Sequence, residues 1–134
     1  MIEDKLTESI ISCAYKVHNN LGGGFLEKIY QKAMTIELEQ SGLLTVCEQP
    51  ISVYYSGQLI GSYFADIVVE NKILLELKSV ENLSKSHEVQ IVNYLIATGY
   101  DLGLLINFGP TKVSIKRKTR IFSPLTGWNL FKDD

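Results

Sequence analysis

Two periods of apolar residues run along the chain, and the change between them separates a helical first third from a strand-rich remainder. Over residues 2–21, apolar side chains recur every three or four positions, which places them on one stripe of a helix. Glycines 22–24 end this helix, because glycine suits the left-handed residue that closes one. A second helix is expected over about residues 25–40, closed by Ser41 and Gly42.

The remainder is typical of strands, with one more helix. Two strands with a period of two, over residues 46–55 and 58–69, meet at the tight turn Ser56-Gly57. The later elements are a strand over 73–80, a helix over 86–98, a buried central strand over 102–108 and a last strand over 112–122. The order ααβββαββ predicts an α/β fold with a mixed central β-sheet flanked by helices.

Composition fits one globular domain over residues 1–134. Hydrophobic residues make up 46% of the chain and charged residues 21%, with no repeat, linker or low-complexity segment. This length buries a core without disulfides, so Cys13 and Cys47 are expected to be buried small hydrophobes. The first residues lack a signal-peptide pattern and no apolar run is long enough for a bilayer, so we expect a cytoplasmic protein.

Two consecutive strands carry the main candidate chemistry, with Asp66 near the end of one and Glu76 and Lys78 on the next. A turn centred on Asn71 sets Asp66 opposite Glu76, with the two Cβ atoms about 5 Å apart. Lys78, two residues further along, points to the same face. A shorter turn would set Asp66 opposite Leu77 instead and separate the group.

The apolar neighbours of these residues predict central strands, where adjacent carboxylates are costly unless a cation or a proton lies between them. A hard divalent ion resolves this conflict, so we expect Mg²⁺, with Mn²⁺ as a substitute, held by Asp66, Glu76 and the Leu77 carbonyl. Lys78 would then orient or activate the attacking water, or stabilise charge on a phosphate. The alternative is an ordinary ion pair of Lys78 with one acid on a solvated face, and the motif alone does not separate the two.

Polar residues on two helices extend the candidate site. Glu27 falls at the edge of an apolar stripe, which favours a functional role, although acids are also favoured in the first turn of a helix. Gln90 and Tyr94 are four residues apart on one stripe and could hydrogen-bond the carboxylates or a phosphate. His87 shares that stripe and Asn93 flanks it, but a solvent-exposed polar face explains His87 more simply.

These residues lie within segments that resemble a known family over nearly the whole chain. The segments are Val17-His18, Leu21-Gly22, Gly24-Phe25-Leu26-Glu27, Tyr30, Asp66, Glu76-Leu77-Lys78, His87, Gln90, Asn93-Tyr94-Leu95, residues 103–109 and Arg120-Ile121. Together they resemble the signature of the GxxExxY proteins, a branch of the PD-(D/E)XK nuclease superfamily.

The resemblance implies a restriction-endonuclease-like core and a divalent-metal-dependent nuclease of undefined substrate. The implied roles are Asp66 and Glu76 as metal ligands, Lys78 as the catalytic lysine, Glu27 as the helical acid beside the metal, and Gln90 with Tyr94 as a Q-x-x-x-Y element. Two positions depart from the pattern. Gly23 stands where the family usually has proline, which should loosen the loop before Glu27, and Ala65 stands where the superfamily name shows proline.

The last predicted strand is basic, although the net charge of the chain is −2. Its alternate positions predict one nearly continuous positive face that contacts phosphates, formed by Lys112, Lys116, Lys118 and Arg120. Protection of an edge strand from aggregation is an equally good explanation of these charges.

Three functions follow from the sequence. We favour a nuclease that acts on nucleic acid, DNA in preference to RNA. The alternatives are a catalytically weak or inactive nucleic-acid-binding module and an assembly protein, such as a homodimer, whose polar cluster is structural.

Overall fold

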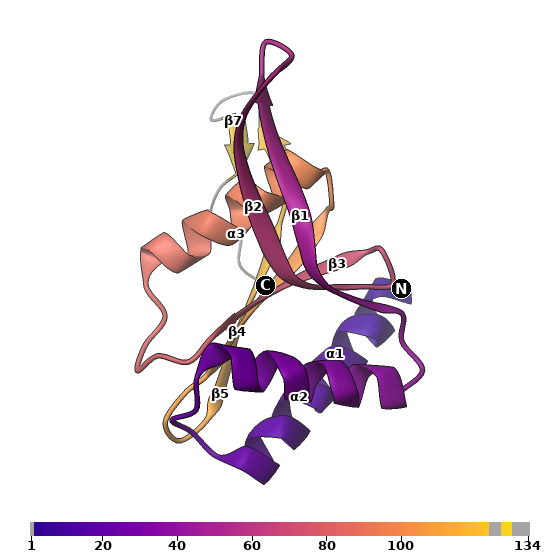
Figure 1. The fold of residues 1–134 in the computed structure, drawn as a ribbon, viewed down its shortest axis with the longest axis vertical. Helices are drawn as coiled ribbons and strands as arrows, with labels where there is room; N and C mark the ends of the chain where they lie inside the picture. Colours follow the sequence, from indigo (N-terminus) through magenta and orange to yellow (C-terminus); the bar gives the residue numbers. More distant parts are fainter. Residues whose placement is uncertain (1, 124–126, 130–134) are drawn as a thin grey trace.

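The structure is a computed structural model that describes the backbone of residues 2–123 and 127–129, and it has the predicted order of elements (Figure 1). The elements are α1 (Ile2–Leu21), α2 (Glu27–Gln40), β1 (Thr45–Tyr55), β2 (Gln58–Val69), β3 (Ile73–Lys78), α3 (Lys85–Thr98), β4 (Leu102–Phe108), β5 (Val113–Thr119), β6 (Ile121–Ser123) and β7 (Gly127–Asn129).

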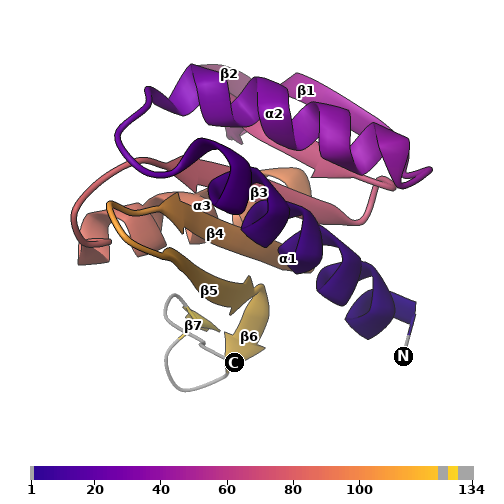
Figure 2. The same cartoon turned by 90° about the horizontal axis from the view of Figure 1, so that it is seen from below.

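Strands β1 to β5 form one mixed sheet in the order β1-β2-β3-β4-β5. Only β3 and β4 are parallel, and helix α3 makes the crossover between them. Helices α1 and α2 lie together on one face of the sheet and α3 lies on the other (Figures 1 and 2). The predicted α/β fold with a mixed sheet flanked by helices is confirmed.

The core has two parts because the sheet is covered on both faces. The larger part joins α1 and α2 to alternate residues of β2, β3 and β4, and the smaller part joins α3 to the opposite face. Every residue of β4 is buried, as the apolar run over 102–108 predicts for a central strand. The other central strand, β3, is buried from Ile73 to Leu77.

Strand β2 lies against β3 only at its C-terminal end, and the divergence of the two strands creates the candidate site. It pairs with β3 only through Ile67, Val68 and Val69. Residues 58–65 pair with β1 alone, so that the β1–β2 hairpin projects away from the rest of the sheet (Figure 1). The far end of β3 therefore lies between β4 and the point where β2 turns away.

Two predicted strand boundaries need correction. The strand expected over 112–122 is interrupted at Arg120, whose backbone N–H donates to the Asp101 carbonyl, and β6 pairs with β7 in a separate sheet. The strand expected to reach residue 80 ends at Lys78. The backbone N–H of Val80 donates to Asn107 Oδ1 and the Val80 carbonyl accepts from Asn107 Nδ2, so both groups are bound to a side chain instead of a neighbouring strand.

The cysteines also differ from one another. Cys13 is buried as expected, whereas Cys47 is exposed because it lies on the edge strand β1, with its Sγ 3.0 Å from Thr35 Oγ1. The helices in the described part of the chain are all too short or too polar to span a bilayer.

Candidate active site

The β2–β3 register brings Asp66 and Glu76 together at the divergence of the two strands. Val69 pairs with Ile73, the register that a turn centred on Asn71 predicts. The backbone N–H of Asp66 donates to Glu76 Oε1 at 3.2 Å, and the N–H of Leu77 donates to Asp66 Oδ2 at 2.7 Å. Each carboxylate thus accepts a hydrogen bond from the backbone of the neighbouring strand, where the regular ladder stops.

Burial gives this pair an electrostatic conflict. Only 4% of the Glu76 surface is exposed, and burial followed by the negative charge of Asp66 raises the pKa of Glu76 to about 8. Burial also raises the pKa of Asp66, and the charges of Glu27 and Glu48 add to this effect. The fold therefore holds two carboxylates where their full ionisation is unfavourable without a compensating cation.

Lys78 provides part of that compensation. It is half-buried at the end of β3, and its positive charge lowers the pKa values of both carboxyls. The compensation is incomplete, because both pKa values stay above their ordinary values.

Glu27 lies near enough to Asp66 and Glu76 to affect their pKa values, but the three carboxylates do not form one cluster. It is exposed at the first residue of α2, and its charge raises the pKa values of Asp66 and Glu76. Across residues 2–123 and 127–129, no three acidic, histidine or cysteine side chains are arranged to hold a metal ion. The described site thus offers a pair of carboxylates rather than a ready three-carboxylate cage.

Tyr30 fixes the loop that delivers Glu27. Its hydroxyl donates to the Gly22 carbonyl at 2.6 Å and accepts from the Phe25 N–H at 3.3 Å. Its ring stacks on Phe108 with the centroids 4.5 Å apart. The tyrosine of the Gly24–Glu27–Tyr30 motif therefore ties the start of α2 to the central strand β4.

Close packing against the 109–110 backbone explains why glycine occupies position 23 in this chain. A Cβ placed there would lie 2.7 Å from the Gly109 carbonyl oxygen and 2.7 Å from backbone atoms of Pro110. The same turn is held from the other side by His18, whose Nε2 lies 2.8 Å from Gly109 O. A proline at position 23 would have to displace the 109–110 backbone.

Gln90 and Tyr94 lie beside the carboxylate pair, on α3. The side chain of Gln90 lies close enough to the Tyr94 hydroxyl to lower its pKa. Burial, followed by the charges of Glu76 and Asp66, raises the pKa of Tyr94 to about 12, so its hydroxyl stays protonated at neutral pH. Both residues line a pocket of about 230 Å³, together with Tyr63, Ser86, Val89 and Asn93.

His87 has a structural role instead. Its Nδ1 accepts from the backbone N–H of Ser84 at 3.0 Å, while the Ser84 side chain accepts from the His87 N–H. This reciprocal capping box closes the N-terminus of α3.

Two residues near Asp66 escaped the sequence analysis. Gln31 is buried and donates from Nε2 to the Asp66 carbonyl at 2.9 Å. It follows Glu27 by four residues, so the helical period offered a signal. Glu48 lies across from Asp66 in the β1–β2 register and forms an ion pair with Lys28 at 2.7 Å. Its φ is positive, at 53°, within the continuous strand β1, and no sequence pattern signals this.

The predicted basic face is only partly present. Lys118 is fully buried under α3, in an ion pair with Glu88 at 2.7 Å. Arg120 lies 3.0 Å from Asp101 and donates to the carbonyls of Gly99 and Tyr100. The expectation of one continuous positive face is therefore wrong, because Lys118 is paired with α3 and Arg120 is bound to the 99–101 turn.

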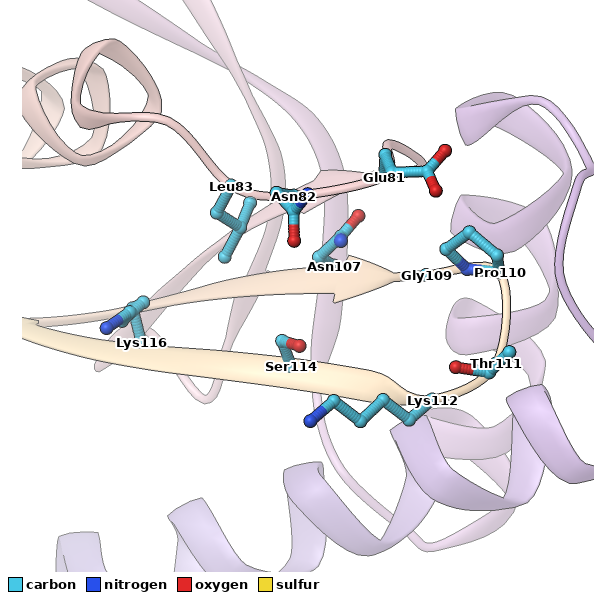
Figure 3. Close-up of a pocket in the computed structure, with 10 residues that line it drawn as sticks. All are labelled: Glu81, Asn82, Leu83, Asn107, Gly109, Pro110, Thr111, Lys112, Ser114 and Lys116. Carbon is cyan, nitrogen blue, oxygen red and sulfur yellow. The ribbon is translucent and has the colours of Figure 1, made fainter.

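Lys112 and Lys116 remain at the surface. They line a pocket of about 380 Å³ between the β4–β5 hairpin and the loop after β3 (Figure 3). The other lining residues are Glu81, Asn82, Leu83, Asn107, Gly109, Pro110, Thr111 and Ser114.

The fold agrees with the comparisons to known proteins. The chain belongs to the PD-(D/E)XK nuclease superfamily, whose family model matches residues 4–118. The crystal structure of SSO0001 is similar with a TM-score of 0.57 and 17% sequence identity, over 74% of this chain and 52% of that one. This likeness is one of fold, and the chain spans about half the length of that protein. Among curated proteins, none matches the chain.

Proposed function

We propose that the chain is a divalent-metal-dependent nuclease that hydrolyses phosphodiester bonds at Asp66, Glu76 and Lys78. The observation that carries this proposal is the buried pair of carboxylates at the divergence of β2 and β3, with the pKa of Glu76 raised to about 8. A stable fold has little reason to keep two such groups together unless a cation binds between them. Nuclease activity is also typical of the superfamily to which the chain belongs. Within the superfamily, the motif of Gly24, Glu27 and Tyr30 supports the GxxExxY branch.

The residues present fit Mg²⁺. This ion is usually held by one or two carboxylates, with water and substrate phosphates in its remaining positions. Asp66 and Glu76 supply the two carboxylates, and the Leu77 carbonyl is a candidate third oxygen from the chain. Glu27, exposed at the start of α2, would serve at the rim of the site. When bound, the ion would offset negative charge on the phosphate and favour ionisation of the attacking water.

The other polar groups have roles that follow from their charge and placement. Lys78, at the end of β3, would orient the attacking water or stabilise the phosphate in the transition state. Tyr94 keeps its proton and would donate a hydrogen bond to a carboxylate or to the substrate, oriented by Gln90. Hydrolysis forms a bond from the water oxygen to phosphorus and breaks the bond to the leaving oxygen, which takes up a proton.

Nucleic acid would approach from the side of the β4–β5 hairpin, and we expect DNA in preference to RNA. Lys112 and Lys116 have no ion-pair partner in the described part of the chain. They line one pocket with the hydroxyl groups of Thr111 and Ser114 (Figure 3). Ammonium and hydroxyl groups in a concave surface suit the phosphates of a nucleic-acid backbone.

The test is a cleavage assay on labelled single-stranded, double-stranded and branched DNA and RNA, with Mg²⁺, Mn²⁺ or EDTA. We expect cutting that requires the metal and falls at least about 100-fold in Glu76→Gln and in Lys78→Ala. Lys72→Ala, an exposed lysine at the β2–β3 turn, is the matched control and should cut like the wild type. Cutting that persists in EDTA or in Glu76→Gln would overturn the proposal.

A further inference from the structure

The outer part of the β1–β2 hairpin presents the largest group of uncovered apolar side chains on the described surface. We call residues 50–64 the hairpin arm. In Figure 1 the tip of the arm lies at one end of the long axis, beyond helices α1, α2 and α3. Six large apolar side chains of the arm are between 49% and 72% exposed: Tyr54, Tyr55, Leu59, Ile60, Tyr63 and Phe64. Exposed apolar groups of this extent usually mark an interaction site.

The charges of this region argue against nucleic acid as its occupant. The arm contains no Asp, Glu, Lys, Arg or His, and residues 33–71 contain no Lys, Arg or His. The acids at its base, Glu48 and Asp66, would repel a phosphate backbone. The two lysines of the 380 Å³ pocket lie elsewhere, between the β4–β5 hairpin and the loop after β3. An uncharged apolar surface of this kind suits another protein.

The size and neutrality of the arm fit a second copy of the chain. Consecutive strand residues point to opposite faces, so these six side chains divide between the two faces of the hairpin. Together they present an area on the order of 700 Å², and a dimer that buries both faces comes close to the roughly 800 Å² that each partner buries in a stable interface. A two-fold interface joins identical surfaces, so it needs a surface that does not repel itself, and the arm carries no charge.

Two residues at the base of β1 disfavour a dimer contact made by backbone pairing between strands, which leaves contact through side chains. Pro50 lacks a backbone N–H, and Glu48 has a positive φ of 53°, so the outer edge of β1 is interrupted for pairing with another strand. We propose that two copies of the chain form a dimer by packing their hairpin arms against each other through these side chains.

The dimer would also border the candidate active site. Tyr63 of the arm lies with its ring centroid 5.2 Å from that of Tyr94, and it is three residues from Asp66. The second copy would therefore stand beside the open side of the carboxylate pair. This inference does not depend on catalysis, so it survives or fails separately from the proposed nuclease.

The test is sedimentation velocity of the full chain between about 1 and 100 μM, compared with Tyr55→Glu and with Leu59→Glu. These side chains are exposed, so the variants should keep the far-ultraviolet circular dichroism of the wild type. We expect a wild-type mass twice the 15.1 kDa of one chain, and monomers for both variants. Ile36→Glu, an exposed apolar residue of α2 outside the arm, is the matched control and should remain a dimer.

Three outcomes would overturn the proposal. The first is a wild type that is monomeric at every concentration. The second is a dimer that dissociates in Ile36→Glu but not in the arm variants. The third is a monomeric wild type whose affinity for nucleic acid falls in the arm variants, which would assign the arm to substrate instead.

Discussion

Glu76 is a carboxylic acid that the fold holds in a place unfavourable for its ionised form. Its pKa rises from an ordinary 4.5 to about 8, because the side chain is buried and lies beside Asp66. The folded protein therefore keeps the Glu76 proton over a pH range in which the unfolded chain has lost it. Such a group stabilises the fold below its unfolded pKa, and this stability is lost as the pH rises through the folded pKa.

This sign gives a prediction for the metal-free protein. The free energy of unfolding in EDTA should fall by a few kcal/mol, on the order expected for a shift of this size, as the pH rises from about 4.5 to about 8. Urea denaturation at a series of pH values measures this decline. The raised pKa of Asp66 acts in the same direction.

Glu76→Gln is the control for that decline. Glutamine keeps the shape of the protonated acid and has no charge to lose. Its free energy of unfolding should exceed that of the wild type above pH 8, while its cutting is lost. A decline as steep as that of the wild type would show that Glu76 does not carry the effect.

Sequence reasoning reached the carboxylate pair because a strand register is simple arithmetic. Once the turn is centred on Asn71, the pairing of Asp66 with Glu76 follows. The observed register of the β1–β2 hairpin sets Glu48 across from Asp66, but the positive φ of Glu48 is not encoded in any periodicity. Gln31 was within reach of the sequence, since it follows Glu27 at helical spacing, but its hydrogen bond to the Asp66 carbonyl is visible only in the structure.

At the scale of elements, periodicity predicted nearly all helices and strands, and the errors occur where side chains interrupt the backbone pattern. Strand β3 ends early because Asn107 binds both backbone groups of Val80. The last predicted strand divides at Arg120. These contacts join segments far apart in sequence, so a local pattern cannot contain them.

In the basic strand β5, too, a contact with a distant segment was invisible to the local sequence pattern, and this contact yields a second prediction. Alternation placed Lys116 and Lys118 on one face, but it could not show that α3 covers Lys118 and pairs it with Glu88. Lys118→Ala leaves the largely buried Glu88 carboxylate without this partner, and should cost about 3 kcal/mol of unfolding free energy. Lys116→Ala, at the surface, should change it by less than about 0.5 kcal/mol.

For DNA binding the order of the two variants should be reversed, with the larger effect in Lys116→Ala and the smaller in Lys118→Ala. The affinity for DNA measured against salt concentration should have a slope lower by about one in Lys116→Ala, because one phosphate contact is lost. Lys118→Ala, tested at a temperature where it is folded, should keep the wild-type slope. A reduced slope in Lys118→Ala alone would contradict the assignment of Lys118 to the core.

At the scale of the whole molecule, different chemical properties are separated in space. The lysine-lined pocket lies beside the β4–β5 hairpin, the carboxylate pair lies where β2 leaves β3, and the uncharged hairpin arm projects beyond them (Figure 1). The sequence predicted the sheet and helices, but the projection of the arm depends on where β2 stops pairing with β3, which only the three-dimensional structure reveals. This arrangement allows substrate and a second copy of the chain to approach by separate surfaces.

Calorimetric titration of the purified chain with Mg²⁺ and Mn²⁺ shows whether Asp66 and Glu76 form a divalent-metal site. We predict that the wild type binds the ion and that Glu76→Gln, folded and at the same concentration, gives no binding heat. If the wild type binds no ion, or if Glu76→Gln binds it equally well, Asp66 and Glu76 do not form a metal site and the carboxylate pair is a structural feature of the fold.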